Sequence, residues 1–159
     1  MLSPTRVYVA LGSNLGDRQG NVREAIRRLA ALAAGEVRAS SIHLTAPEEM
    51  VDEAGEFANA VAGFDTTLDA RELLAALQAI EVAMGRPATH AHHVSRVIDL
   101  DIISFGNRII NEPDLQIPHP GAHRRIFVLG PLAEIAGQLV LAGQSDPVNR
   151  LLQQLDAGE

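Results

Sequence analysis

The sequence contains no cysteine and no tryptophan, and it has only one tyrosine and four phenylalanines among 159 residues. Without cysteine there can be no disulfide bond and no thiolate chemistry. Because 47% of the residues are hydrophobic but only 3% are aromatic, we expect a core of Ala, Val, Leu and Ile side chains. The length suits a single domain spanning residues 1–159, with one hydrophobic core.

Basic residues and long apolar runs are also scarce. Thirteen Lys and Arg against twenty Asp and Glu give a formal net charge of -7, which argues against a general binder of nucleic-acid phosphates. The first apolar run, Val7 to Leu11, is far too short for a signal peptide or a membrane span. We therefore expect a cytoplasmic protein that binds neither nucleic acid nor membranes and holds any phosphate at one local site. We also expect a monomer, although nothing in the composition determines the oligomeric state.

Hydrophobic periodicity predicts the order strand, helix, strand, strand, helix, strand. Strands are expected at residues 6–11, 37–44, 56–64 and 96–105, and helices after Asp17 and from Asp69 to Gly85. Glu72 follows Asp69 by three residues, as in a capping box. Further helices are expected within 117–137, in two pieces, and from Asp146, where Pro147 takes the first position. This βαββαβ order predicts an α+β, ferredoxin-like core, an antiparallel sheet with helices packed on one face, plus C-terminal helices.

Two acids, Asp99 and Asp101, lie within the otherwise apolar strand sequence RVIDLDIISFG, residues 96–106. Acids are depleted in strands, and removing a carboxylate from water is costly unless a cation compensates. Alternation along a strand puts both acids on one face, about 7 Å apart, with the intervening apolar residues on the other. Such oxygen ligands suit Mg²⁺, which takes its remaining ligands from water and substrate phosphates. The alternative is a solvated edge where the acids pair with Arg96 or Arg108.

Two other motifs leave alternatives open. GSNLGD, residues 12–17, follows a strand and opens a helix as a phosphate-binding loop would, but it lacks the lysine and glycine spacing of a Walker A loop. A tight turn with a helix cap is therefore the favoured interpretation. His90, His92 and His93 could bind a transition metal, although a polar loop of this kind is more commonly solvated.

Six segments occur in order over nearly the whole chain: ALGSNLGD, TAP, FANAV, IEVAMGR, RVIDLDIISFG and IPHPGAHRRIFVLGPLAEIAG. In these segments the sequence resembles the 6-hydroxymethyl-7,8-dihydropterin pyrophosphokinases of folate biosynthesis. The resemblance implies transfer of the pyrophosphoryl group of ATP to the hydroxymethyl group of the pterin, giving AMP and the pterin diphosphate. It also implies that Asp99 and Asp101 hold two Mg²⁺ ions, which bridge the triphosphate and the substrate hydroxyl.

The same resemblance implies a role for further residues. The residues implied in catalysis are Arg86, Arg96, Asp99 and Asp101. The residues implied in ATP binding are Glu81, Arg86, His92, Arg96, Ile102, His119 and Arg125. The residues implied in pterin binding are Thr45, Ala46, Pro47, Phe57, Asn59 and Phe127. Phosphoryl transfer depends mainly on alignment and charge neutralisation, so the reaction needs no nucleophilic Ser or Cys.

The sequence departs from the family pattern in one loop. Family members commonly carry an Arg-Trp pair and a proline where this chain has His92, His93 and Ser95, and Ala88 replaces a further loop arginine. Histidine is largely neutral at pH 7, so we predict weaker nucleotide binding that tightens toward about pH 6. One alternative function is a paralogue that binds a pterin without transfer or acts on a related pterin. Another is an RNA-binding module of the same topology, which the two acids disfavour because they repel phosphate.

Overall fold

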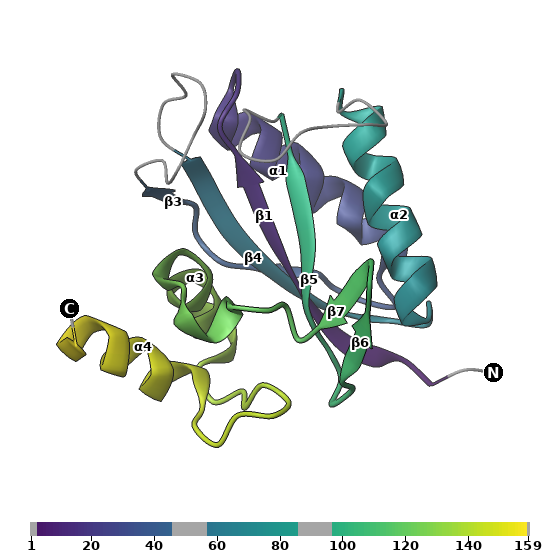
Figure 1. Cartoon of the computed structure of the whole chain (residues 1–159). Coiled ribbons are helices and arrows are strands. Elements are labelled where there is room, and N and C mark those ends of the chain that lie inside the picture. The colour runs from purple at the N-terminus through teal and green to yellow at the C-terminus, as the bar shows by residue number, and fades with distance from the viewer. Residues whose placement is uncertain (1–2, 46–56, 86–96, 159) are drawn as a thin grey trace.

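Antiparallel pairing around one central strand organises the main sheet of the computed structural model, which describes residues 3–45, 57–85 and 97–158 (Figure 1). The strands are β1 (Thr5–Ser13), β2 (Arg38–Ala39), β3 (His43–Thr45), β4 (Phe57–Thr66), β5 (Asp99–Phe105), β6 (Ile110–Glu112) and β7 (Leu115–Ile117). Strand β1 lies between β4 and β5 and is antiparallel to both. Strands β2 and β3 pair with the other edge of β4, while β6 and β7 form a separate hairpin.

Two helices cover one face of this sheet. They are α1 (Arg18–Leu29), which continues into the 3-10 turn η1 (Ala30–Leu32), and α2 (Ala70–Ala83). Their apolar residues, including Leu29 and Leu77, pack with alternate residues of β1, β4 and β5 in one buried cluster. This confirms the predicted α+β arrangement, in which the helices of the βαββαβ core share one face of an antiparallel sheet.

Both helices begin at a capping aspartate. The Asp17 carboxylate accepts a hydrogen bond of 3.1 Å from the Gly20 N–H at the start of α1. At the start of α2, the Asp69 carboxylate accepts from the Glu72 N–H at 2.8 Å, and the Glu72 carboxylate accepts from the Asp69 N–H at 2.9 Å. The capping box is therefore confirmed, and so is the interpretation of residues 12–17 as a turn that leads into a helix cap.

The C-terminal helices pack on the opposite face of the sheet (Figure 1). They are the 3-10 turn η2 (Ala122–Arg124), α3 (Ile126–Ala136) and α4 (Val148–Gly158), and they share a second buried cluster with Ile103 of β5. Helix α4 begins just after Pro147 rather than at it. No helix within the described residues is long and apolar enough to cross a membrane.

The single strand expected at 37–44 is divided into β2 and β3, so this prediction was partly wrong. Ser40 interrupts the ladder: its N–H donates to the Val61 carbonyl at 2.8 Å, while its hydroxyl accepts from the Val61 N–H at 3.0 Å. The pairing with β4 shifts by one residue between β2 and β3. Because one extra residue reverses the side to which later side chains point, His43 faces α3 instead of the core beneath α1 and α2.

Candidate active site

Asp99 and Asp101 lie on the same face of β5. In the ladder between β5 and β1, Asp99 pairs with Gly12 and Asp101 pairs with Ala10. Leu100, between the two acids, points into the core beneath α1 and α2 and is 5% exposed. Both aspartates are only partly buried. The predicted pair of carboxylates on one face of a strand is therefore confirmed.

Gly12 separates Asp99 from Asn59. It pairs with Asp99 on one side and with Asn59 on the other, so the backbones of these two residues lie about 10 Å apart across two strand spacings. A Cβ at Gly12 would lie 3.4 Å from Asn59 Oδ1 and 3.8 Å from Phe57 Cδ1. Glycine therefore adds no side chain above β1, between a carboxylate and an amide, and a glycine within a strand is typical of a site that a ligand or another backbone approaches closely.

The predicted pterin residues Thr45, Phe57 and Asn59 meet where β3 pairs with β4. Thr45 is the ladder partner of Phe57. Asn59 is 7% exposed, and its Nδ2 donates a hydrogen bond of 2.8 Å to Thr45 Oγ1. This bond fixes the orientation of the amide and leaves its Oδ1 on the side of Gly12.

Arg125 and Phe127 lie at the start of α3, on the same side of the sheet as the aspartates. Ala10 pairs with both Asp101 and Val61, and Val61 packs in the cluster that includes α3. The guanidinium carbon of Arg125 lies 5.7 Å from the centroid of the Phe127 ring, within the range of a cation–π contact. The structure thus brings a cation and an aromatic ring to the face that carries the two acids.

His119 precedes η2 and lies close to Asp99 and Arg125. The backbone N–H of His119 donates to the Ile103 carbonyl at 2.9 Å, which fixes this part of the backbone against β5. Its Nδ1 is buried and has no hydrogen-bond partner within the part of the chain that the structure describes. Burial and the Arg125 charge lower the pKa of His119, while the Pro120 backbone and Asp99 act in the opposite direction. A neutral imidazole whose Nδ1 meets no partner in residues 3–45, 57–85 and 97–158 is suited to bind a polar ligand atom.

Glu81 and Ile102 belong to the buried side of the site. Glu81 is 6% exposed, and its Oε2 accepts a hydrogen bond of 2.7 Å from the Leu100 N–H at the outer edge of β5. The side chain of Ile102 is 5% exposed and packs in the core beneath α1 and α2. Their contacts with ATP stay predictions.

The remaining predicted site residues, Ala46, Pro47, Arg86, His92 and Arg96, lie outside the described residues.

Sequence reasoning missed two features of this face. The first is Gly12, although a glycine within a strand is a known signal of close approach by a ligand or backbone. The second is a polar contact that joins Ser41 and His43 to Glu134 of α3. These residues are 91 to 93 positions apart, and no local pattern connects them.

The donors present on this face fit Mg²⁺. Asp99 and Asp101 supply hard carboxylate oxygens from one side of β5. No group of three or more His, Cys, Asp or Glu side chains suited to a metal occurs within residues 3–45, 57–85 and 97–158. A metal bound by the two aspartates would therefore complete its shell with water or phosphate oxygens, as Mg²⁺ commonly does.

The sequence of this chain is similar to that of a known family. Residues 8–137 match the family model of 7,8-dihydro-6-hydroxymethylpterin-pyrophosphokinase (HPPK). The chain is 36% identical over 152 residues to 2-amino-4-hydroxy-6-hydroxymethyldihydropteridine pyrophosphokinase from Methylorubrum extorquens, covering 96% of this chain and 94% of that protein. It is 41% identical over 133 residues to the Bacillus subtilis protein of the same name, covering 83% and 78%. The chain belongs to the HPPK family.

Longer relatives contain the same unit within a larger chain. The folic acid synthesis protein fol1 of Pneumocystis carinii is 40% identical over 134 residues, which are 84% of this chain but only 18% of that protein. A crystal structure of Plasmodium falciparum HPPK-DHPS with pterin and p-hydroxybenzoate has a TM-score of 0.77 at 14% identity, covering 99% of this chain and 44% of that chain. At this identity the structural likeness concerns the fold alone.

Proposed function

We propose that this protein transfers the pyrophosphoryl group of ATP to 6-hydroxymethyl-7,8-dihydropterin in folate biosynthesis. The hydroxymethyl oxygen attacks the β-phosphorus of ATP, and the bond from that phosphorus to the α–β bridging oxygen breaks. AMP leaves with the bridging oxygen, the hydroxyl proton passes to solvent, and the pterin diphosphate remains. Membership of the HPPK family supports this reaction. The observation that carries it is the strand register, which places Asp99 and Asn59 on either side of Gly12.

Asp99 and Asp101 are the residues that would hold Mg²⁺, as two ions in this proposal. When bound, Mg²⁺ neutralises charge on the triphosphate and on the group being transferred. Arg125 contributes a permanent positive charge on the face of the sheet that carries the aspartates. The Nδ1 of His119, which has no hydrogen-bond partner among the described residues, offers a further contact for a phosphate oxygen.

The pterin is held on the other side of Gly12 in this proposal. Asn59, oriented by Thr45, hydrogen bonds to the polar edge of the heterocycle, while Phe57 and Phe127 contact its flat faces. The hydroxymethyl group then points across Gly12 toward Asp99. Catalysis comes mostly from this alignment and from charge neutralisation, because phosphoryl-type transfer needs little covalent help from the protein.

The direct test is incubation of the purified protein with ATP, Mg²⁺ and 6-hydroxymethyl-7,8-dihydropterin, followed by separation of the nucleotides. AMP that forms only when the pterin is present supports the proposal. Formation of ADP, or no turnover, contradicts it, and pterin binding without AMP would point to the paralogue that binds without transfer. That the protein is a single-domain, cytoplasmic monomer stays a prediction from the sequence.

A further inference from the structure

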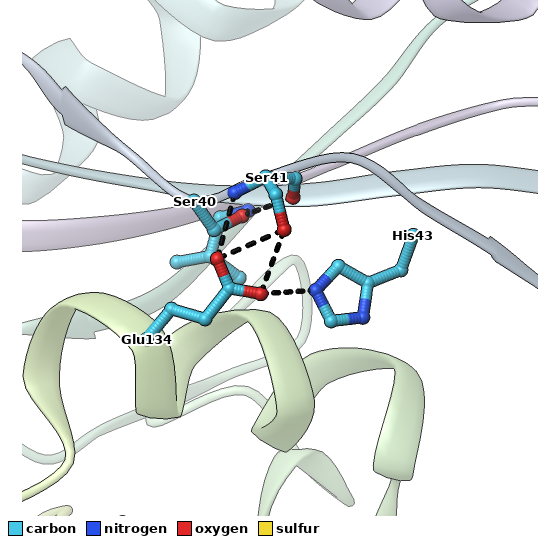
Figure 2. Close-up of polar contacts among 5 residues, drawn as sticks. Ser40, Ser41, His43 and Glu134 are labelled. Atoms are coloured by element: carbon cyan, nitrogen blue, oxygen red, sulfur yellow. Dashed lines mark hydrogen bonds and ion pairs between the residues drawn. The ribbon is translucent and has the colours of Figure 1, made fainter.

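A polar contact joins Ser41, between β2 and β3, and His43, at the start of β3, to Glu134 of helix α3 (Figure 2). The Ser41 N–H donates to Glu134 Oε1 at 2.8 Å, and the Ser41 hydroxyl lies 2.9 Å from Oε1 and 2.8 Å from Oε2. His43 Nε2 hydrogen bonds to Glu134 Oε2. Burial acts to raise the pKa of the Glu134 carboxyl, but the bonds from Ser41 and His43 outweigh it and lower this pKa below its ordinary value. Glu134 is therefore a carboxylate that accepts hydrogen bonds from both residues at neutral pH.

On the helix side, this contact lies along the stripe of α3 that begins with Phe127. Gly130 and Glu134 follow Phe127 by three and seven residues, which places all three on one side of the helix. A Cβ at Gly130 would lie 3.7 Å from Cε1 and Nδ1 of His43. The imidazole therefore lies against Gly130, one helical turn from Phe127, while its Nε2 reaches Glu134.

On the strand side, His43 is next to the residues that would bind the polar edge of the pterin. It is the ladder partner of Asn59, and Thr45 follows two positions later on the same face. Thr45 accepts the hydrogen bond that orients the Asn59 amide. His43 thus lies between the Asn59–Thr45 pair and the helix that carries Phe127.

We propose that His43, anchored by Glu134, is a positioning residue for the pterin: it sets the separation between the Asn59 amide and the Phe127 ring. This inference rests on the proposed function. The apolar contacts of α3, through residues such as Leu129 and Leu132, stabilise the helix on the sheet but are not directional. A hydrogen bond between β3 and α3 is directional, so its loss should shift the helix relative to Asn59 while the fold persists.

The test compares three variants with the wild-type protein in a steady-state assay of AMP formation. His43→Leu, which keeps bulk but removes the donor, should raise the KM for the pterin about tenfold, because the shifted helix would cost the bound pterin contacts worth about one hydrogen bond. His43→Gln, whose amide can still donate to Glu134, should restore most of that loss. The matched control is Arg71→Gln, which removes the 2.8 Å contact between α2 and Asp114 far from this face and should leave both KM values unchanged.

The KM for ATP distinguishes a positioning role of His43 from a general structural role. Under the proposal, His43→Leu raises the KM for ATP less than the KM for the pterin, because Arg125 moves with α3 whereas Asp99 and Asp101 stay on β5. An unchanged pterin KM in His43→Leu, an equal rise in both KM values, or failure of His43→Gln to recover binding would overturn the inference.

The proposed function can fail independently of this inference. If the wild-type protein forms no AMP, pterin binding is measured by calorimetry with Mg²⁺ and a nonhydrolysable ATP analogue, and the same ranking of variants is expected. Wild-type turnover with equal pterin affinity in all variants overturns only the role of His43. No pterin binding by the wild-type protein overturns both.

Discussion

Gly12→Ala should reduce activity without reducing stability. Gly12 is the residue without a side chain between Asp99 and Asn59, and its φ is not in the left-handed region, so its backbone accepts alanine without strain. The new methyl would lie 3.4 Å from Asn59 Oδ1 and 3.8 Å from the Phe57 ring, which are ordinary van der Waals separations. The fold has room for this methyl, but a substrate lying above β1 would have to move.

The two expected effects have opposite signs. Glycine within a strand is less favourable than alanine by about 0.5–1 kcal/mol, so the free energy of unfolding should rise by a similar amount. For a domain of this size that corresponds to an increase of about 1–4 °C in Tm. A substrate displaced by about 1 Å can react about 100-fold more slowly, so kcat/KM for the pterin should fall about 10- to 100-fold.

The assay pairs thermal unfolding with steady-state kinetics, and Gly63→Ala is the matched control. Gly63 lies on the same face of the neighbouring strand, but a Cβ there would lie 2.5 Å from Tyr8 Cε1, so the ring must move. This overpacking should lower stability by about 1–3 kcal/mol while the folded fraction keeps its KM values. Gly12→Ala protein with wild-type kcat/KM would refute the inference that substrate occupies the space above Gly12.

Three further changes test other parts of the structure. Asp99→Asn should lower kcat at least about 100-fold by weakening Mg²⁺ binding, with no loss in the urea midpoint; substantial residual turnover would remove Asp99 from the metal site. Asp69→Ala removes the capping box of α2 and should cost about 1 kcal/mol in thermal unfolding, with unchanged KM values, whereas unchanged stability would show that this cap contributes nothing. Burial acts to raise the pKa of Glu134, but hydrogen bonds from Ser41 and His43 outweigh it and lower this pKa from 4.5. The ionised Glu134 therefore contributes to the free energy of unfolding above that pH, and this contribution is lost as pH falls through the lowered pKa. Urea unfolding between about pH 6 and about pH 3 should therefore show less loss of stability in Glu134→Gln than in the wild-type protein, and parallel curves would contradict this.

The local features of this protein follow from its sequence. The capping box at Asp69 and Glu72 depends on residues three positions apart, and the common face of Asp99 and Asp101 depends only on the alternation of side chains along a strand. The order of strands and helices follows in the same way from hydrophobic periodicity. These features could be predicted because each depends on neighbouring residues and on backbone geometry.

The tertiary structure decided which of these segments face one another. The register of β1 against its two neighbours places Gly12 between Asp99 and Asn59, and the extra residue between β2 and β3 turns His43 toward Glu134. Local propensities do not specify such pairings, because strand register and helix placement are selected by the packing of residues far apart in the chain. The sequence by itself therefore determined the order of the main strands and helices and the pair of acids, whereas the position of the Asn59 amide opposite Asp99 and the contact between His43 and Glu134 came only from the packed fold.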